Sequence, residues 1–143
     1  LSFFVVMPKV YIAGPLFNKH ERKYLEEIAD ILEANGYDCF LPHRDLAVDP
    51  EVLKGVDMSQ ETKDFIFQTD SDALEKADII VALITGQDID SGTCCEIGYS
   101  YAMKKPVIAI DAYERRYRNL FVEGMLTTTI NDTDQLLDTI ENI

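Results

Sequence analysis

Apolar residues along the chain fall into two kinds of segment. Short, nearly continuous apolar runs are typical of strands buried on both faces of a parallel sheet. Such runs occur at residues 10–13, 37–41, 79–84 and 107–110. Between them lie longer segments in which apolar residues recur at helical spacing. The pattern therefore predicts strands that alternate with helices.

Capping residues and breakers predict where the helices begin and end. Asn18, followed by Glu21, predicts the start of a first helix, which Asn35-Gly36 ends. Ser59 predicts a helix to about Lys76, and Asp132 a last helix. A further helix is expected from Thr93 to Lys105, stopped by Pro106. The inner side of the Ser59 helix is expected to carry Phe65, Ile66, Ala73, Leu74 and Ala77.

Two segments lack a clean period. Residues 43–58 are expected to form a long surface loop, and residues 121–130, with their threonine triplet, a fifth strand. The sum is one α/β domain, an open sheet of about five strands with helices on both faces. Residues 7–143 are expected to form the domain. Residues 1–6, which precede Met7, are expected to be an extension.

Charge and cysteine content narrow the class of protein. The net charge of −13 argues against binding to a nucleic-acid polymer or an anionic membrane. The first six residues are too short to span a membrane and lack the basic flank of a signal peptide. Three cysteines, two of them adjacent, predict reduced, buried thiols in a cytoplasmic protein. Cys and His show no metal-ligand spacing.

Candidate chemistry lies between the third and fourth apolar runs. Asp88, Asp90 and Gly92 form a polar loop, and Glu96 follows. In one interpretation Thr93 and Glu96 form a capping box, so that Glu96 only caps a helix. In the other, Glu96 in the first helical turn is held ionised by the helix dipole, as a nucleophilic carboxylate requires. These two interpretations are compatible.

Four motifs in order resemble the nucleoside 2-deoxyribosyltransferase family. They are Tyr11-Ile-Ala-Gly-Pro-Leu-Phe17, Asp70 before Ala77-Asp78-Ile-Ile-Val-Ala82, Asp90-Ser-Gly-Thr-Cys-Cys-Glu96-Ile-Gly-Tyr, and Asn119-Leu-Phe-Val-Glu-Gly124. The resemblance covers nearly the whole chain from Met7. It implies a flavodoxin-like, Rossmann-like fold and an enzyme that exchanges the base of 2′-deoxyribonucleosides in nucleoside salvage, without cofactor, phosphate or metal.

The resemblance also implies catalytic roles. Glu96 would attack the anomeric carbon and form a glycosyl-enzyme, and a second base would displace it with retention of configuration. Asp90 or Asp70 would protonate the leaving base, and the sequence does not decide between them. Asp72 lies two residues from Asp70, so the assignment of the matching acid stays open. Tyr11 would orient Glu96 through its hydroxyl, or would simply pack in the core.

Substrate-binding roles follow from the same resemblance. Gly14 would allow close approach of the backbone, and Ser91 and Gly92 would line the site. Phe17 would pack on sugar or base, or would simply be a core aromatic. Asn119 would hold the 5′-hydroxyl in the site of an adjacent subunit. The partners implied are 2′-deoxyribonucleosides, free nucleobases and a further copy of the chain, in a dimer or larger homo-oligomer. Purine or pyrimidine specificity stays open.

Two rival functions remain. A 2′-deoxynucleoside 5′-monophosphate N-glycosidase would use the same carboxylate and pass the sugar to water. It needs a phosphate pocket, and the loop Gly14-Pro15-Leu16-Phe17 offers no Ser or Arg, although Ser91 and Arg118 are near in sequence. The other rival is a non-catalytic flavodoxin-like binding or signalling module that holds Mg²⁺ at its acidic edge. The apolar run at residues 107–110 is followed by Asp111, where such a module would have lysine.

Overall fold

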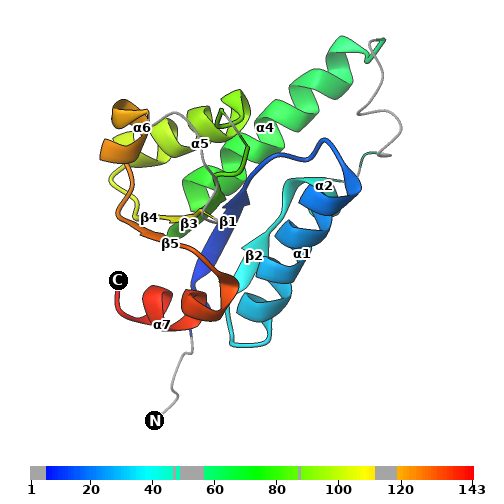
Figure 1. Cartoon of the computed structure of the whole chain (residues 1–143). Helices are drawn as coiled ribbons and strands as arrows, with labels where there is room; N and C mark the ends of the chain where they lie inside the picture. The colour runs from blue at the N-terminus through cyan, green and yellow to red at the C-terminus, as the bar shows by residue number, and fades with distance from the viewer. Residues whose placement is uncertain (1–5, 47, 49–56, 87, 112–118) are drawn as a thin grey trace.

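The structure, a computed structural model, describes residues 6–46, 48, 57–86, 88–111 and 119–143. Strands and helices alternate along most of the chain (Figure 1). The strands are β1 (Lys9–Ala13), β2 (Asp38–Phe40), β3 (Ile79–Leu83), β4 (Val107–Ile110) and β5 (Thr128–Ile130). The helices are α1 (Lys19–Glu33), α2 (Pro42–Asp45), α4 (Gln60–Lys76), α5 (Ser91–Ala102), α6 (Leu120–Gly124), the 3₁₀ turn η1 (Thr133–Gln135) and α7 (Leu136–Glu141).

The five strands form one parallel sheet in the order β2-β1-β3-β4-β5. This is the flavodoxin-like order, and it confirms the predicted fold class. The chain leaves β1 toward one edge of the sheet and leaves β3 toward the other. The carboxyl ends of these two neighbouring strands therefore form the switch point at which open parallel sheets bind their ligands.

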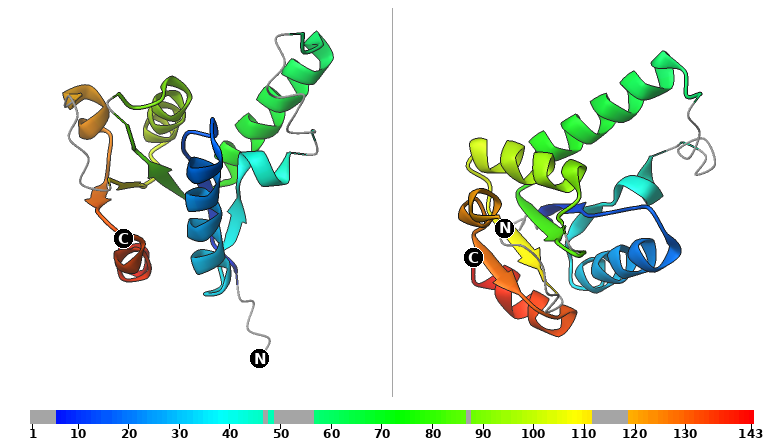
Figure 2. Two further views of the ribbon diagram at one scale, coloured as in Figure 1. Left: turned by 45° about the vertical axis from the view of Figure 1, so that its right-hand side comes forward. Right: turned by 45° about the horizontal axis from the view of Figure 1, so that its top comes forward.

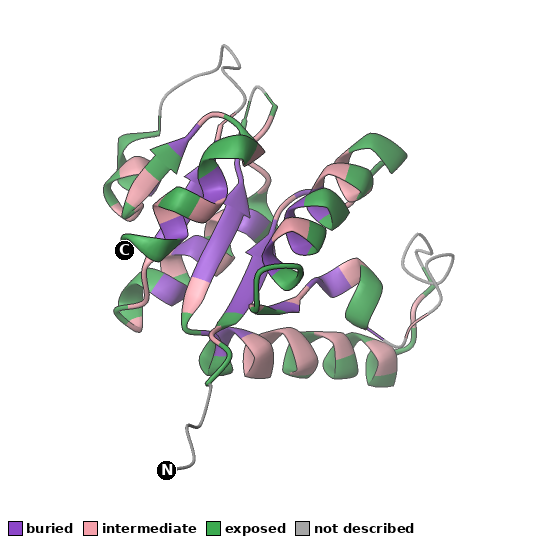
Figure 3. Cartoon of the chain, turned by 90° about the horizontal axis from the view of Figure 1, so that it is seen from below, coloured by how far each residue is buried: buried purple, intermediate pink, exposed green. Residues whose placement is uncertain are grey.

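Helices cover both faces of the sheet, and the strands between them are buried (Figures 2 and 3). On one face α1 and α7 pack on even-numbered residues of β1, Val10 and Ile12. On the other face Leu74 and Ala77, at the end of α4, and Ile97 of α5 pack with the odd-numbered Tyr11 and Ala13. Because side chains alternate along a strand, Tyr11 is directed to the layer that contains Glu96.

Small side chains bring α5 close to the sheet. Ala13 pairs with Ala82 and Ala82 pairs with Ala109, so three alanines form a row across β1, β3 and β4. All three are buried on the α4–α5 face. Helix α5 contacts each of these strands. We call these three residues the alanine row. Because their side chains are small, one helix can contact three strands.

The expected caps of three helices are confirmed. Asn18 accepts a hydrogen bond from the backbone N–H of Glu21, Ser59 accepts one from Thr62, and Asp132 accepts one from Asp134. The runs at 10–13, 37–41, 79–84 and 107–110 all contain strands. No helix within the described ranges is both long and apolar enough to cross a membrane.

Several expectations about the second half of the chain are wrong. The predicted fifth strand is confirmed at Thr128–Ile130, but its predicted start at residue 121 is wrong, because Asn119 accepts hydrogen bonds from the N–H groups of Phe121 and Val122 and so caps helix α6. Phe65, expected on the inner side of its helix, is 48% exposed. The cysteines are free, but Cys95 is exposed on α5, so the prediction of buried thiols fails for it.

Other expectations fall partly on residues outside the described ranges. In the predicted 43–58 loop, His43, Arg44 and Asp45 belong to the single turn α2, whereas residues 47 and 49–56 are not described. The extension at residues 1–6 is described only at Val6, and Arg118 is also outside.

Hydrogen bonds tie α4 to α5 and to the turn after it. The Tyr99 hydroxyl donates to Glu75 Oε1 at 2.8 Å. The Lys105 ammonium donates to the carbonyl oxygens of Leu74 and Ala77, each at 2.7 Å, and to that of Glu75. These carbonyls end α4 and lack helical partners, so Lys105 satisfies them and fixes this end of the helix.

We predict that Gly14→Ala destabilises the protein. A Cβ atom at Gly14 would lie 2.7 Å from Leu25 Cδ2 and 3.2 Å from Leu83 Cβ, so the fully buried Leu25 side chain would have to shift and the contact with Leu83 would be tight. Overpacking of this kind costs about 1–3 kcal/mol, measurable by urea unfolding. Gly124→Ala is the control, because nothing lies within 4 Å of its Cβ position. Equal free energies of unfolding for wild type and Gly14→Ala would contradict the prediction.

Candidate active site

Three predicted catalytic residues meet beneath the carboxyl edge of β1 and β3. Tyr11 comes from β1, Asp70 from α4 and Glu96 from α5. The Tyr11 hydroxyl is buried, and burial, with Glu96 and Asp70 nearby, raises its pKa well above the ordinary value. It lies outside strict hydrogen-bond geometry with any described group but is close enough to Glu96 to lower the pKa of that carboxyl. Tyr11 is thus a neutral donor facing the carboxylate.

Glu96 is not where the capping-box interpretation placed it. Asp90 is the N-cap of α5, and its Oδ2 accepts from the Thr93 N–H at 3.1 Å and from the Thr93 hydroxyl at 3.0 Å. The helix thus begins earlier, and Glu96 lies in its second turn, beyond the free N–H groups. Burial, together with Asp70 and Asp90, raises the pKa of Glu96 to about 7. The expectation that the helix dipole holds it ionised is wrong.

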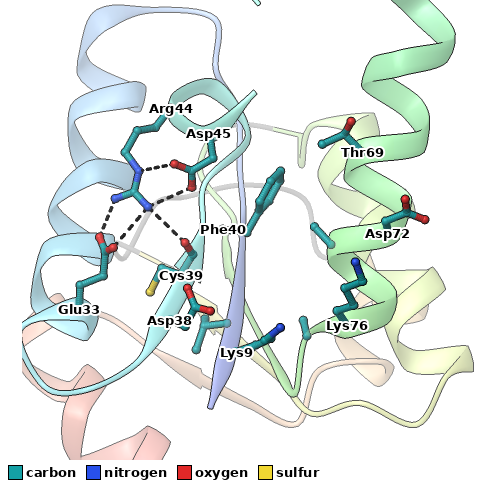
Figure 4. Close-up of a pocket in the computed structure, with 13 residues that line it drawn as sticks. Lys9, Glu33, Asp38, Cys39, Phe40, Arg44, Asp45, Thr69, Asp72 and Lys76 are labelled. Carbon is teal, nitrogen blue, oxygen red and sulfur yellow. Dashed lines mark hydrogen bonds and ion pairs between the residues drawn. The ribbon is translucent and has the colours of Figure 1, made fainter. Parts of the chain in front are cut away.

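Asp70 is the acid that shares a cavity with Glu96. Burial raises the pKa of Asp70 to about 6, and its Oδ1 is buried without a hydrogen-bond partner among the described residues. Asp72 instead lines a separate cleft of 610 Å³ with Lys9 and Lys76, near the β2 edge (Figure 4). Two residues along a helix differ by more than half a turn, which separates the two carboxylates.

The cavity between α4 and α5 has a volume of 580 Å³. We call it the α4–α5 groove. Its walls include Phe67, Asp70 and Glu75 of α4 and Gly92, Glu96 and Tyr99 of α5. The hydrogen bond from Tyr99 to Glu75 joins its two walls.

A second hollow of 450 Å³ lies at the carboxyl edge of the sheet. Phe17, Asn18, Asp88 and Asp90 line it, and the Phe17 ring is 74% exposed. Asp90 and Gly92 link this hollow to the groove, because a Cβ at Gly92 would lie 3.3 Å from Asp90 Oδ2. Asp90 is thus close enough to Glu96 to raise the pKa of that carboxyl, but it lines the second hollow and not the α4–α5 groove.

The remaining predicted substrate residues are spread around these two depressions. Ser91 is exposed at the first position of α5. Gly14 packs under Leu25 and Leu83, so packing alone requires glycine there. Asn119 is exposed at the start of α6 and lines neither depression. Within the described chain, therefore, Asn119 is not brought together with Glu96.

Sequence reasoning missed two aromatic residues of the groove. Phe67 lies three residues before Asp70, and Tyr99 three residues after Glu96. Residues at this spacing share a helix face, which is the signal that could have identified them. The apolar period of the 59–76 segment concealed it, because Phe65 and Ile66 attracted the assignment of the inner face.

The donor set of the site is one of carboxylates and a phenol. Among the described residues, no three His, Cys, Asp or Glu side chains form a group able to hold a metal ion. Two carboxyl groups with raised pKa values beside a buried hydroxyl are suited to nucleophilic and acid–base catalysis. Fold and site together define a parallel α/β protein with paired carboxyl groups at its ligand-binding edge, an arrangement typical of enzymes.

Comparison with known proteins specifies the family. The family model for nucleoside 2-deoxyribosyltransferases matches residues 10–139. The chain belongs to the nucleoside 2-deoxyribosyltransferase family, which confirms the predicted family and the prediction of an enzyme.

Individual relatives include two kinds of protein. The chain is 30% identical to a nucleoside deoxyribosyltransferase of Limosilactobacillus fermentum, over 91% of the chain and 83% of the relative. It is 28% identical to a putative 2′-deoxynucleoside 5′-phosphate N-hydrolase 1 of Thermofilum pendens, over 94% of each. A solved 2-deoxyribosyltransferase from Bacillus psychrosaccharolyticus is 27% identical, with a TM-score of 0.77 over 90% of the chain and 89% of the other.

We predict that Glu96→Gln stabilises the protein at alkaline pH. The pKa of Glu96 is raised from 4.5 to about 7, so the folded state holds its proton more tightly than the unfolded state. Stability is therefore lost as pH rises from about 4.5 through about 7, and glutamine avoids that loss. We expect a gain on the order of 2 kcal/mol at about pH 8.5 and almost none at about pH 4.

Urea unfolding at several pH values measures this difference. Glu27→Gln, at an exposed position on α1, is the matched control and should show a small difference independent of pH. A Glu96→Gln effect that does not change with pH would contradict the assignment of Glu96 as a carboxyl with a raised pKa.

Proposed function

We propose that the protein exchanges the base of 2′-deoxyribonucleosides through a covalent 2-deoxyribosyl–Glu96 intermediate. The observation that carries the proposal is that Glu96 and the unpartnered Asp70 oxygen share one groove, and that the buried Tyr11 hydroxyl lies close to Glu96. Tyr11 and Asp70 each keep a buried polar atom without a partner among the described residues. Unsatisfied groups of this kind are expected where a ligand supplies the missing hydrogen bond.

In the first step a Glu96 oxygen attacks the anomeric carbon as the bond from that carbon to the base nitrogen breaks. The electrons of that bond go to the base, which takes a proton from Asp70. A pKa of about 6 leaves part of the Asp70 population protonated near neutral pH. In the second step the nitrogen of an incoming base displaces Glu96 and returns its proton to Asp70, so configuration is retained.

Asp90 has a different part in this proposal. Its Oδ2 already accepts two hydrogen bonds from Thr93. We assign the proton of the leaving base to Asp70, because Asp70 shares the groove with Glu96 and its pKa is raised to about 6. Asp90 fixes the start of α5 and offers its remaining oxygen to the substrate, beside Phe17 and Ser91.

The second candidate is hydrolysis of 2′-deoxynucleoside 5′-monophosphates. The likeness to the putative hydrolase of Thermofilum pendens favours it. The loop before α1 provides little for a phosphate, because the nearby Arg22 guanidinium donates to the Leu16 carbonyl oxygen at 2.9 Å. Without Ser or Arg side chains on residues 14–17, base exchange remains the better proposal.

We predict that the protein converts 2′-deoxyinosine and adenine into deoxyadenosine and hypoxanthine. Glu96→Ala should lower the rate at least about a thousandfold, because the nucleophile is lost. Asp70→Asn should lower it about 10²–10⁴-fold with the fold intact. Chromatography of products with and without adenine measures this, with Asp72→Asn as the matched control.

Each other outcome of that experiment is informative. Hypoxanthine release that does not require adenine, or turnover of the 5′-monophosphate alone, would replace exchange by hydrolysis. Absence of turnover of nucleosides and monophosphates by the folded protein would contradict both. Equal losses in Asp70→Asn and Asp72→Asn would contradict the role of Asp70.

We also propose that the active unit is a homo-oligomer in which Asn119 serves the site of a neighbouring subunit. Support comes from the surface around Asn119. Leu120 is 75% exposed and Phe121 is 81% exposed, beside an apolar hollow that α5 and α6 form. Apolar surface of this kind is typical of contacts between subunits. The Asn119 Oδ1 is occupied as the α6 cap, so its amide N–H groups would bind the substrate.

We predict that Asn119→Asp inactivates the enzyme while it keeps the cap. Refolding it together with Glu96→Ala should restore about a quarter of wild-type activity in a dimer, because half of the molecules are hybrids with one intact site of two. Activity assays on the mixture test this. A mixture no more active than its separate parts, or a fully active Asn119→Asp, would contradict the shared site.

Finally, we propose a cytoplasmic location. All three cysteines are free thiols, and the exposed Cys95 is suited to a reducing compartment.

A further inference from the structure

The Phe67 side chain is an exposed aromatic ring at the catalytic groove. It is 73% exposed, yet it lines the same cavity as Asp70 and Glu96. Phe65, on the same helix, is 48% exposed and does not line this cavity. An apolar ring left in water beside two catalytic carboxyl groups is expected where a ligand covers it.

Helical geometry places Phe67 next to the group that would bind the base. Phe67 precedes Asp70 by three residues, so both side chains project from the same face of α4. The buried Asp70 Oδ1 lacks a partner among the described residues. A base hydrogen-bonded to that oxygen would therefore lie alongside the Phe67 ring, on the α4 wall opposite Glu96.

The groove has one closed and one open end. At the amino edge of the sheet, the Tyr99 hydroxyl bonds to Glu75 and joins the two helices. Toward the carboxyl edge the walls are Phe67 and Gly92, and glycine has no side chain to block the path. Helix α4 extends past the carboxyl ends of the strands there (Figure 1). A planar ligand would enter between Phe67 and Gly92.

We propose that Phe67 is the stacking platform for the nucleobase, a substrate-binding residue that contacts both the leaving and the incoming base. This inference rests on the proposed function. Phenylalanine offers a π face and no hydrogen-bonding group, so it would stack on every base and distinguish them only by ring area. We expect the platform to favour purines over pyrimidines and to leave finer selection to polar groups.

The test compares Phe67→Ala, Phe67→Tyr and Phe65→Ala in the base-exchange assay. Stacking on an aromatic side chain is worth a factor of about ten or more per base, so Phe67→Ala should raise the KM for adenine about tenfold or more. The kcat of Phe67→Ala should change less than about threefold. Phe67→Tyr, which keeps an aromatic ring, should have the wild-type KM. Phe65→Ala, which alters an equally aromatic but non-lining position, should behave as wild type.

Binding of free adenine to Glu96→Gln, with and without Phe67→Ala, separates this proposal from the proposed function. If wild type performs no exchange, the proposed function fails, whereas a tenfold loss of adenine affinity in calorimetry still supports the platform. An unchanged affinity in Phe67→Ala would overturn it. An equal loss of affinity in Phe65→Ala would also overturn it. A lower molecular mass of Phe67→Ala by light scattering would overturn it too, because Phe67 would then be a contact between subunits.

Discussion

The catalytic arrangement depends on how closely α5 packs on the sheet. Ala13, Ala82 and Ala109 are register partners on three neighbouring strands, and α5 contacts all three strands. Bulkier residues in this alanine row would lift the helix and move Glu96 away from Tyr11. Two residues earlier on each strand, on the same face, Tyr11, Ile80 and Val107 form a row of larger side chains. The Tyr11 ring is stacked on Phe40, with centroids 5.5 Å apart, so its hydroxyl cannot turn away.

Electrostatics at the site work against stability. Burial raises the pKa of Glu96, and the nearby charges of Asp70 and Asp90 raise it further. When Glu96 is ionised at the working pH, the free energy of unfolding is therefore lower than it would be with a glutamine at this position. The Tyr11 hydroxyl opposes this shift in part, because its interaction lowers the pKa of Glu96. The same hydroxyl makes no hydrogen bond of strict geometry with the described residues, so its interaction with Glu96 is weaker than an ideal hydrogen bond.

Much of the fold could be predicted from the sequence, because buried parallel strands and their caps leave strong local signals. The runs at 79–84 and 107–110 and the caps Asn18, Ser59 and Asp132 are of this kind. The start of α5 could not be predicted in the same way. Asp90 and Thr93 are both good caps, and only the tertiary position of the loop after β3 selects Asp90. That choice moves Glu96 from the first helical turn into the second and changes the physical cause of its pKa.

The candidate site was predictable to a different degree for each residue. The motifs indicated Tyr11, Asp70 and Glu96. Asp70 and Asp72 can be distinguished only by the side of the helix on which each lies. The apolar period predicts that side only when the inner face of the helix is correctly assigned. In α4 the apolar residues Phe65 and Ile66 misled that assignment, since Phe65 is exposed. In segment 121–130 the threonine-rich end correctly predicted a strand, whereas residues 121–124 were wrongly included, because the Asn119 cap starts a helix there.

The division of the fold into two layers explains why function concentrates on one of them. Helices α1 and α7 cover their face with large aliphatic residues such as Leu25, Ile28 and Leu136, all fully buried. On the opposite face Tyr99 of α5, and Lys105 after it, bond to the C-terminal end of α4, and a groove lies between the two helices. A tightly packed layer thus holds the sheet rigid. The other layer contacts the same sheet through the alanine row and keeps space for a substrate. Because Tyr11 belongs to the sheet and Glu96 to α5, any change in how α5 packs on the sheet changes the position of Glu96 relative to Tyr11.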